Sequence, residues 1–381
     1  MSHPLLRSLT FLGTSSGVPT AYRNVSGSCL SFTDGRVWLF DAGEGTQHQL
    51  LRCPGVSSGR IERIFVTHLH GDHCYGLPGL ICSTSMMWQP PGIVKLPEGY
   101  DPEDDDCPQI HDHFSKSSQF LEIYGPCGLA ELLRVVFRTS EAGFGFQYRV
   151  TELLPSDQQP SIPPVLQAHE APPRYVFPDP EGAYQLPADD FGGISVRAAQ
   201  LTHRVPCVGY AITEPTTPGA LDMEIAKRLG IPKGPLLGKL KAGETIEFDV
   251  EGEKRIIRPT DVLGPAIVGR TVLLLGDTCD SAKCHRIASG CEWVVHEATF
   301  DDANEKLAVP RGHSTSRMAA KFAQALGAKN LVLTHFSARF APAAKDPEQI
   351  QRLISQAQEV FGQNVFAAED FWSLDLSRKK V

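Results

Sequence analysis

The chain is organised around one short sequence, Thr67-His68-Leu69-His70-Gly71-Asp72-His73, which directly follows the apolar run at 61–66. That run has the β-branched, bulky composition of a short buried strand, so the histidines and the aspartate are expected where the strand ends and the backbone turns. Neutral imidazole nitrogens and carboxylate oxygens are ligands that zinc prefers, and together these side chains can supply two adjacent ions. The alternative, a histidine-rich surface turn, gives no reason for this spacing directly behind an apolar strand. The sequence therefore predicts a metal site at this strand end.

The same order, an apolar strand and then a polar side chain, recurs further along the chain. Residues 272–275 precede Asp277, residues 331–333 precede His335, and His203 has a similar placement. Any one of these three side chains alone would more often be structural. Strand ends, however, are where α/β sheets place their sites. We therefore expect all three to join the first cluster.

Five histidines and two aspartates are enough to hold two ions. A carboxylate that bridges two ions is the usual device of metal hydrolases acting on phosphate esters, and we expect Asp277 to be this bridge. Structural zinc sites are closed four-coordinate cages without a bridged pair, which argues against a non-catalytic RNA-binding protein with structural metal. The candidate metal ligands are His68, His70, Asp72, His73, His203, Asp277 and His335.

Composition limits the classes of protein to which the chain can belong. With 381 residues, 41% of them hydrophobic, it can bury a large core, and we expect a single domain over residues 1–381 with insertions. The absence of an apolar run of transmembrane length, and of signal or transit character at residues 1–13, predicts a soluble protein with no membrane partner. The ten cysteines form no CxxC pair, as expected for reduced thiols in a cytosol or a nucleus. A net charge of −8 argues against coating of nucleic acid by bulk electrostatics.

Residues 88–119 interrupt this pattern. They are rich in proline and acidic residues and contain few large apolar side chains, so we expect a surface insertion. His111 and His113 inside it could bind metal, but no apolar strand or helix fixes their side chains. A solvated loop is the expected state of this segment.

A second segment, 213–264, carries its own elements and a local positive charge. Helical spacing at 222–229 and a hairpin between 245 and 257 predict a small protrusion with too little core to be a domain. Residues 225–243 include five cations and no acidic side chain, so this patch is either an ordinary solvated face or a surface that neutralises phosphates. Aromatic platforms for single strands are not evident, so we expect any nucleic acid to be held by its backbone and shape. The candidate RNA-binding residues are Lys227, Arg228, Lys233, Lys239 and Lys241.

The motifs at these strand ends carry a family resemblance. His68-x-His70-x-Asp72-His73 resembles the signature of the metallo-β-lactamase fold, which lactamases, glyoxalases and arylsulfatase-like enzymes share. In combination with His296-Glu297-Ala298-Thr299, the chain resembles ribonuclease Z, the tRNA 3′-end processing endonuclease, in its short form. The resemblance runs from Leu9 to about Phe340. Its further motifs lie at 11–15, 40–46, 76–79, 276–278, 312–315 and 333–337.

The resemblance implies a four-layer αββα sandwich with a protruding flexible arm and two zinc ions at the edge of its two sheets. One zinc would take His68, His70 and His203, the other Asp72, His73 and His335, and Asp277 would bridge. A water between the ions would attack the phosphorus, and Asp72 would orient it. The implied reaction is cleavage of precursor tRNA 3′ of the discriminator nucleotide, which leaves a 3′-hydroxyl and releases the 3′ trailer.

The ribose 3′-oxygen is a poor leaving group, so a proton donor is expected on the far side of the phosphorus from the metals. His313, which precedes a helix expected at 316–326, is the candidate. Glu297, which follows a strand expected at 293–295, is expected to accept its other ring proton. The alternative is that His313 caps the helix and Glu297 is a buried, satisfied carboxylate.

The resemblance also implies precursor tRNA as the partner, with no DNA expected, and a homodimer in which the arm of one subunit serves the active site of the other. Residues 229–238 are similar to the Gly/Pro-containing arm with which this family holds the tRNA elbow. One departure is Ala21, which stands where the family motif Pro-x-Lys-x-Arg-Asn has lysine, and it leaves open whether CCA-bearing tRNA is refused. The alternative function is a hydrolase of small phosphodiesters or esters on the same fold, which would have no use for the arm.

Overall fold

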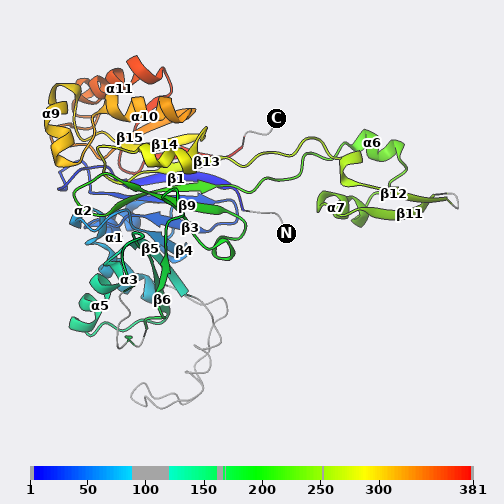
Figure 1. Cartoon of the computed structure of the whole chain (residues 1–381), viewed down its shortest axis with the longest axis horizontal. Helices are drawn as coiled ribbons and strands as arrows, with labels where there is room; N and C mark the ends of the chain where they lie inside the picture. The colour runs from blue at the N-terminus through cyan, green and yellow to red at the C-terminus, as the bar shows by residue number, and fades with distance from the viewer. Residues whose placement is uncertain (1–3, 88–119, 161–165, 168, 251–252, 379–381) are drawn as a thin grey trace, which may run out of the picture.

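Two β-sheets pack face to face at the centre of the molecule, and helices lie on the outer face of each (Figure 1). The computed structural model describes residues 4–87, 120–160, 166–167, 169–250 and 253–378. Over these residues the first sheet has eight strands and the second has seven. Across the first sheet the order is β17 (Ser373–Asp375), β1 (Leu6–Gly13), β2 (Gly27–Phe32), β3 (Val37–Phe40), β4 (Ile61–Phe65), β5 (Phe120–Pro126), β6 (Gln147–Leu153) and β7 (Arg174–Val176). Across the second it is β16 (Val365–Ala367), β15 (Asn330–Thr334), β14 (Trp293–Glu297), β13 (Thr271–Leu274), β10 (Cys207–Thr213), β9 (Ser195–Leu201) and β8 (Ala183–Gln185).

An apolar layer between the sheets holds them together. Trp38 on β3 and Tyr210 on β10 are fully buried in it, one from each sheet. The Phe65 ring stacks on those of Phe40 and Tyr124, with centroids 4.8 and 4.9 Å apart. Removing these large rings from water is the main force that joins the two sheets.

Helices cover the two outer faces. Separate apolar clusters lie beneath them, one including Leu133 and the other Leu353. The helices on the first sheet are α1 (Thr46–Arg52), α3 (Leu77–Met87) and α5 (Leu129–Thr139), and those on the second are α8 (His285–Ala288), α10 (Ser316–Leu326) and α11 (Pro347–Phe361). The predicted four-layer αββα sandwich is therefore confirmed.

Several predicted local elements form as expected. The strand expected at 61–66 is β4, that at 272–275 is β13, and that at 331–333 lies within β15. The helix expected at 316–326 is α10, but its N-cap is Thr315, whose hydroxyl accepts the Met318 N–H at 3.2 Å. The interpretation of His313 as the helix cap is therefore wrong, because Thr315 already fills that role.

The parallel strands determine where the candidate ligands lie. Strands β3, β4 and β5 run parallel in the first sheet, and β13, β14 and β15 run parallel in the second. Their C-terminal ends therefore meet at one edge of each sheet. The segments that follow β4, β13 and β15 come together there, although residues 68 and 335 lie far apart in the sequence.

The segment 213–264 projects away from the sandwich (Figure 1). It contains α6 (Met223–Arg228), α7 (Pro235–Lys241) and the hairpin of β11 (Ile246–Val250) and β12 (Glu253–Ile257). The predicted helix and hairpin are confirmed. Helix α7 was not predicted, because the Gly/Pro run before it indicates a stop, whereas Pro235 lies at the first helical position and is tolerated there. A small buried cluster that includes Ala226, Leu240 and Ile257 holds these elements together.

Two further expectations from the sequence concern the insertion at 88–119 and membrane-spanning helices. The surface insertion predicted at 88–119 lies outside the described residues. None of the helices in the described ranges is long and apolar enough to span a membrane.

Candidate metal centre and active site

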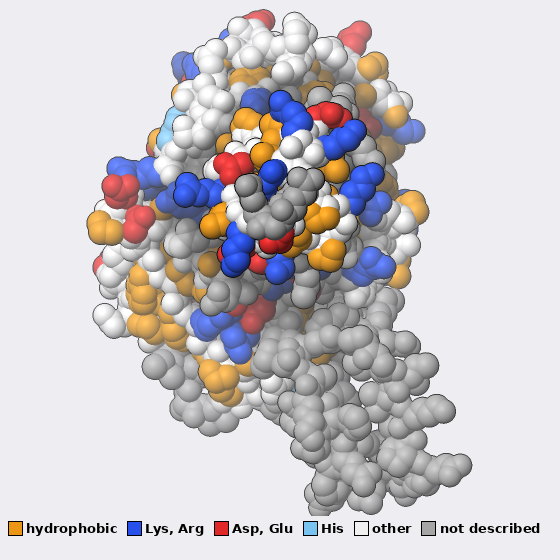
Figure 2. Space-filling model, turned by 90° about the vertical axis from the view of Figure 1, so that its right-hand side faces the viewer, with side chains coloured by type: hydrophobic (Ala, Val, Ile, Leu, Met, Phe, Trp, Pro, Cys, Tyr) orange, Lys and Arg blue, Asp and Glu red, His pale blue; other side chains and the backbone are white. Residues whose placement is uncertain are grey.

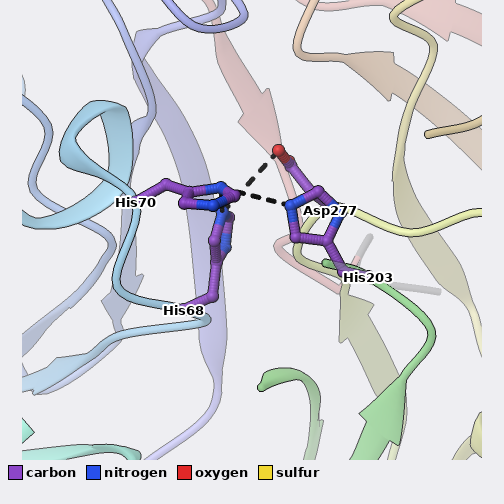
Figure 3. A group of neighbouring side chains, drawn as sticks. All are labelled: His68, His70, His203 and Asp277. Atoms are coloured by element: carbon purple, nitrogen blue, oxygen red, sulfur yellow. Dashed lines mark hydrogen bonds and ion pairs between the residues drawn. The ribbon is translucent and has the colours of Figure 1, made fainter. Parts of the chain in front are cut away.

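The seven predicted metal ligands meet in two groups that share Asp277. In the first group, ligand atoms of His68, His70, His203 and Asp277 all lie within 4.8 Å of one another, and in the second those of Asp72, His73, Asp277 and His335 do so. Figure 3 shows the three imidazole rings of the first group and the Asp277 carboxylate pointing toward one another from separate segments of the chain.

The two oxygens of Asp277 face the two groups separately. Oδ1 lies 3.4 Å from Nε2 of His73 and 3.3 Å from Nε2 of His335, while Oδ2 lies 3.7 Å from Nε2 of His68. The carboxylate is almost completely buried. This is the arrangement that a bridging carboxylate requires.

In four of the histidines, Nδ1 points away from the centre and has a polar partner, while Nε2 points toward the centre. Nδ1 of His73 lies 2.7 Å from Asp41 Oδ2, and Nδ1 of His203 lies 2.7 Å from the Gly312 carbonyl oxygen. Nδ1 of His68 and of His335 lie 3.1 and 3.0 Å from the hydroxyls of Thr67 and Thr299. If each Nδ1–H donates outward, each Nε2 presents its lone pair to the centre, as metal-binding histidines do.

The nitrogens that point toward the centre lie close enough to repel one another unless a proton or a metal cation lies between them. His70 Nδ1 is 3.1 Å from His68 Nε2 and 3.2 Å from His203 Nε2, and the Nε2 atoms of His73 and His335 are 3.2 Å apart. Two nitrogens on one tetrahedral zinc are about 3.3 Å apart, given zinc–nitrogen distances of about 2.0–2.1 Å. The spacing and chemistry of the donors therefore fit zinc.

The charges in the centre also fit a bound cation. Burial alone would raise the pKa of Asp277, but His335 and His73 outweigh it and hold the pKa of this carboxyl well below its usual range. Burial would lower the pKa of His73, yet the carboxylates of Asp277 and Asp41 raise it well above its usual value. Burial, followed by the neighbouring His73, lowers the pKa of His68 and favours its neutral form, which binds metal. His73 thus lies in a negative potential where a divalent ion would replace a proton.

Glu297 connects His313 to His335. Its Oε1 accepts from Nδ1 of His313 at 2.9 Å and from the Thr278 N–H at 2.8 Å, and its Oε2 accepts from the Thr299 hydroxyl at 2.6 Å. Thr299 in turn contacts Nδ1 of His335 at 3.0 Å. Burial by itself would lower the pKa of His313, but the Glu297 carboxylate outweighs it and raises the pKa. Glu297 is buried and satisfied, and it also holds the candidate proton donor.

One cavity gives access to this centre. Its volume is about 410 Å³, which falls in the range of small-ligand pockets. The residues that line it are Ser16, Gly17, Glu44, His70, Gly71, Asp72, Tyr75, Arg204, Asp277 and His313. The candidate proton donor and three of the candidate ligands therefore face the same space.

Asp41 belongs to this site, although the sequence motif alone did not assign it a role. Its carboxylate accepts the Thr67 N–H at 2.7 Å and the Thr67 hydroxyl at 2.9 Å, besides contacting His73. Asp41 and His335 both have positive φ, 57° and 56° respectively, which is a strained conformation for residues other than glycine. Asp41 directly follows β3, so the strand-end pattern that indicated the candidate ligands was the signal that could have found it.

The five predicted RNA-binding side chains lie elsewhere. Lys227, Arg228, Lys233, Lys239 and Lys241 are all exposed, on or beside α6 and α7. Figure 2 looks at the end of the molecule that carries this segment and shows Lys and Arg side chains distributed over it. Helix α2 (Gly71–Cys74), which carries Asp72 and His73, lies at the opposite end of the sandwich (Figure 1).

An αββα sandwich with this set of histidines and aspartates at its sheet edges defines a hydrolase of the metallo-β-lactamase fold. The chain is 37% identical over 374 residues to ribonuclease Z of Acaryochloris marina, with 98% of both chains covered. It is 38% identical over 390 residues to human zinc phosphodiesterase ELAC protein 1, covering 98% of this chain and 99% of that protein. The crystal structure of the short form of human tRNase Z matches with a TM-score of 0.62 and 29% identity, over 97% of this chain and 100% of that one. A family model described as anti-Pycsar protein Apyc1 matches residues 7–95. The chain belongs to the ribonuclease Z family of hydrolytic endoribonucleases.

Proposed function

We propose that this protein cleaves precursor tRNA 3′ of the discriminator nucleotide, leaves a 3′-hydroxyl on the tRNA and releases the 3′ trailer. The observation that carries the proposal is the pairing of His313 with Glu297 at the cavity where the metal donors converge. Such a site combines a place for a metal-bound phosphate with a proton donor for an oxygen leaving group. Membership of the ribonuclease Z family supports tRNA as the substrate.

The proposed cofactor is two zinc ions per subunit. His68, His70 and His203 would hold one, Asp72, His73 and His335 the other, with Asp277 between them. When bound, the ions would supply positive charge for the phosphoryl oxygens and lower the pKa of a coordinated water.

The protein's own side chains complete the chemistry. Asp72, whose Oδ2 accepts the Gly17 N–H at 2.7 Å, would orient the attacking water. His313 would give a proton from Nε2 to the departing 3′-oxygen, because its Nδ1 is engaged by Glu297. The Glu297 carboxylate would stabilise the charged imidazolium before the transfer and fix the direction of the ring.

The projecting segment would serve as the arm that holds the tRNA. Its five exposed cations (Lys227, Arg228, Lys233, Lys239 and Lys241) suit phosphate contacts, which supply affinity rather than sequence readout. The domain organisation we propose is one metallo-β-lactamase domain over 1–381, with a surface insertion at 88–119 and the inserted tRNA-binding arm at 213–264.

We further propose a homodimer in which each arm serves the active site of the partner subunit. The separation of the arm from its own metal centre supports this arrangement (Figure 1). Co-expression of Asp277→Ala with an arm variant tests it, because an arm acting in trans restores cleavage by the mixed dimer. An arm acting within its own subunit leaves every subunit of the mixed dimer inactive.

The direct test of function uses labelled precursor tRNA and labelled mature tRNA, each with and without a chelator. Cleavage of the precursor after the discriminator, lost with chelator, is the expected result. The mature substrate reports whether CCA blocks the enzyme when Ala21 replaces the family lysine. Hydrolysis of small phosphodiesters or esters without cleavage of precursor tRNA would favour the alternative function.

The cysteines in the described ranges are free, which supports a reducing compartment such as the cytosol or the nucleus.

A further inference from the structure

The cavity at the metal centre contains an aromatic side chain that the proposed chemistry does not use. Tyr75 follows α2 directly and lines the cavity together with Asp72 and His70. It is 65% exposed, so most of the residue remains available for contact. Aromatic rings beside RNA-processing sites commonly bind unstacked bases, because every base has a π face.

The Tyr75 ring lies against the backbone of the turn that carries the candidate ligands. A Cβ atom at Gly71 would lie 2.5 Å from both Cδ2 and Cε2 of this ring and 3.1 Å from Cγ. These distances are too short for any side chain, so glycine at position 71 is what allows the ring to pack here. One side of the ring therefore packs on the backbone at Gly71, beside the candidate ligands.

The residues that line the cavity come from both halves of the chain. Tyr75 belongs to the first half, with Glu44 and Asp72, while Arg204, Asp277 and His313 belong to the second. An RNA strand bound in this cavity can therefore meet both the candidate proton donor and the aromatic ring. Arg204, which is exposed, can meet the phosphates of such a strand.

We propose that Tyr75 stacks on the nucleobase of the first trailer nucleotide and so positions the scissile phosphate. The inference rests on the proposed function. His313 protonates the 3′-oxygen of the discriminator nucleotide, so the tRNA side of the bond lies beside His313. The first trailer nucleotide is joined to the phosphorus through a different oxygen, so its base is free to reach Tyr75, which lines the same cavity. Because stacking tolerates every base, this contact accepts trailers of any sequence.

The test compares three precursor tRNAs under single-turnover conditions: one intact, one with an abasic ribose at the first trailer position, and one with an abasic ribose at the discriminator. The enzymes are the wild type, Tyr75→Ala, Tyr75→Phe and Phe177→Ala. Phe177 is 45% exposed and does not line the cavity, so it controls for loss of an exposed ring. Metal content is measured for every enzyme.

On the intact substrate, Tyr75→Ala is expected to lower kcat/KM by roughly 5- to 150-fold, the loss that corresponds to one stacked base. Tyr75→Phe keeps the ring and stays within about twofold of the wild type, as does Phe177→Ala. The trailer-abasic substrate lowers the rate of the wild type to the same degree, and Tyr75→Ala loses nothing further on it. On the discriminator-abasic substrate, Tyr75→Ala lowers kcat/KM relative to the wild type by the same factor as on the intact substrate.

An equal penalty of Tyr75→Ala on the intact and the trailer-abasic substrates overturns the inference, and so does a Tyr75→Phe enzyme as slow as Tyr75→Ala. Loss of the penalty on the discriminator-abasic substrate alone shows that the ring meets the other base and also overturns it. These outcomes differ from failure of the proposed function, in which the wild type does not cleave the intact precursor at all and the inference falls with it.

Discussion

Nδ1 of His313 lies 2.9 Å from Oε1 of Glu297, a carboxylate that is 1% exposed. A buried carboxylate beside an imidazole stabilises the charged form of the ring and fixes which nitrogen faces the substrate. The contact therefore gives His313 the two properties that a proton donor at the cavity needs.

Substitution His313→Ala is expected to lower kcat by roughly 10²–10⁴ while the metal content is retained, because the proposed role of the ring is to protonate the leaving group. A precursor tRNA with a 3′-bridging sulfur at the cleavage site has a leaving group that departs without protonation. The variant should recover most of its rate on this substrate. If the sulfur substrate remains as slow as the natural one, His313 positions the RNA or the metals instead.

Glu297→Ala should lower kcat on its own but cause a smaller loss in the His313→Ala background, because part of its effect passes through His313. A double-mutant cycle on kcat measures this coupling. Some loss is expected to persist in the double variant, since Glu297 also contacts Thr299 beside His335. Strictly additive losses would show that the two residues act independently.

Asp277→Ala should reduce bound zinc and abolish cleavage, because its two oxygens face both histidine groups. Metal analysis by mass spectrometry, together with a circular dichroism spectrum to establish folding, measures the effect. A variant that keeps two zinc ions and full activity would exclude the bridging role.

Removal of positive charge from the arm should weaken binding of precursor tRNA without affecting the chemistry. In Lys233→Ser/Lys239→Ser/Lys241→Ser, we expect a higher KM for precursor tRNA and an unchanged rate on a small phosphodiester, because only remote binding is lost. The dependence of log(kcat/KM) on log[salt] should become shallower by roughly 2–3.

The matched control removes three exposed lysines of the sandwich, Lys306, Lys321 and Lys329, by the same substitution. This control changes the net charge by the same amount but leaves the arm intact. It should therefore change the KM for precursor tRNA much less. An equal rise in KM for both variants would mean that the arm makes no special contact.

Glu214 is expected to stabilise the protein in a pH-dependent way. Burial alone would raise the pKa of this carboxyl, but hydrogen bonds from Arg270, Arg378 and the Leu6 N–H lower it to about 2. A lowered folded-state pKa gives stability that is complete above the unfolded value, near 4.5, and is lost as the pH falls toward 2.

Glu214→Gln should therefore lower the free energy of unfolding by roughly 1.5–3 kcal/mol at neutral pH, the range for hydrogen bonds to a charged group. Urea denaturation of both proteins between pH 7 and pH 3 measures the difference. The difference in free energy of unfolding between the two proteins should remain constant down to about pH 5 and become smaller below it. A difference that does not depend on pH would contradict the stabilising role of the lowered Glu214 pKa.

The convergence of the candidate ligands could be predicted because most of them directly follow apolar strands, and strand ends are where α/β sheets place their sites. Asp41 follows β3 in the same way, but its role becomes visible only when its carboxylate is placed against Thr67 and His73. Tyr75 could not be recognised from the sequence, since its significance depends on the packing of its ring on Gly71.

The pairing of strands that lie far apart in the sequence could not be predicted from local sequence patterns either. Strand β17 pairs with β1, so that Ser8 lies opposite Asp375, and no local signal specifies such a register. Helix α7 was missed for a different reason, because a Gly/Pro run that ends one helix here also begins the next. The order of strands within each sheet required the three-dimensional structure.

The sharing of Asp277 between ligands from both halves of the chain has a consequence for biosynthesis. The first candidate ligands, at 68–73, are translated long before His335, which follows β15. A ribosome-bound or truncated chain that lacks His335 cannot assemble the second group of donors. The second half of the donor set therefore comes together only after the segment that follows β15 has been translated.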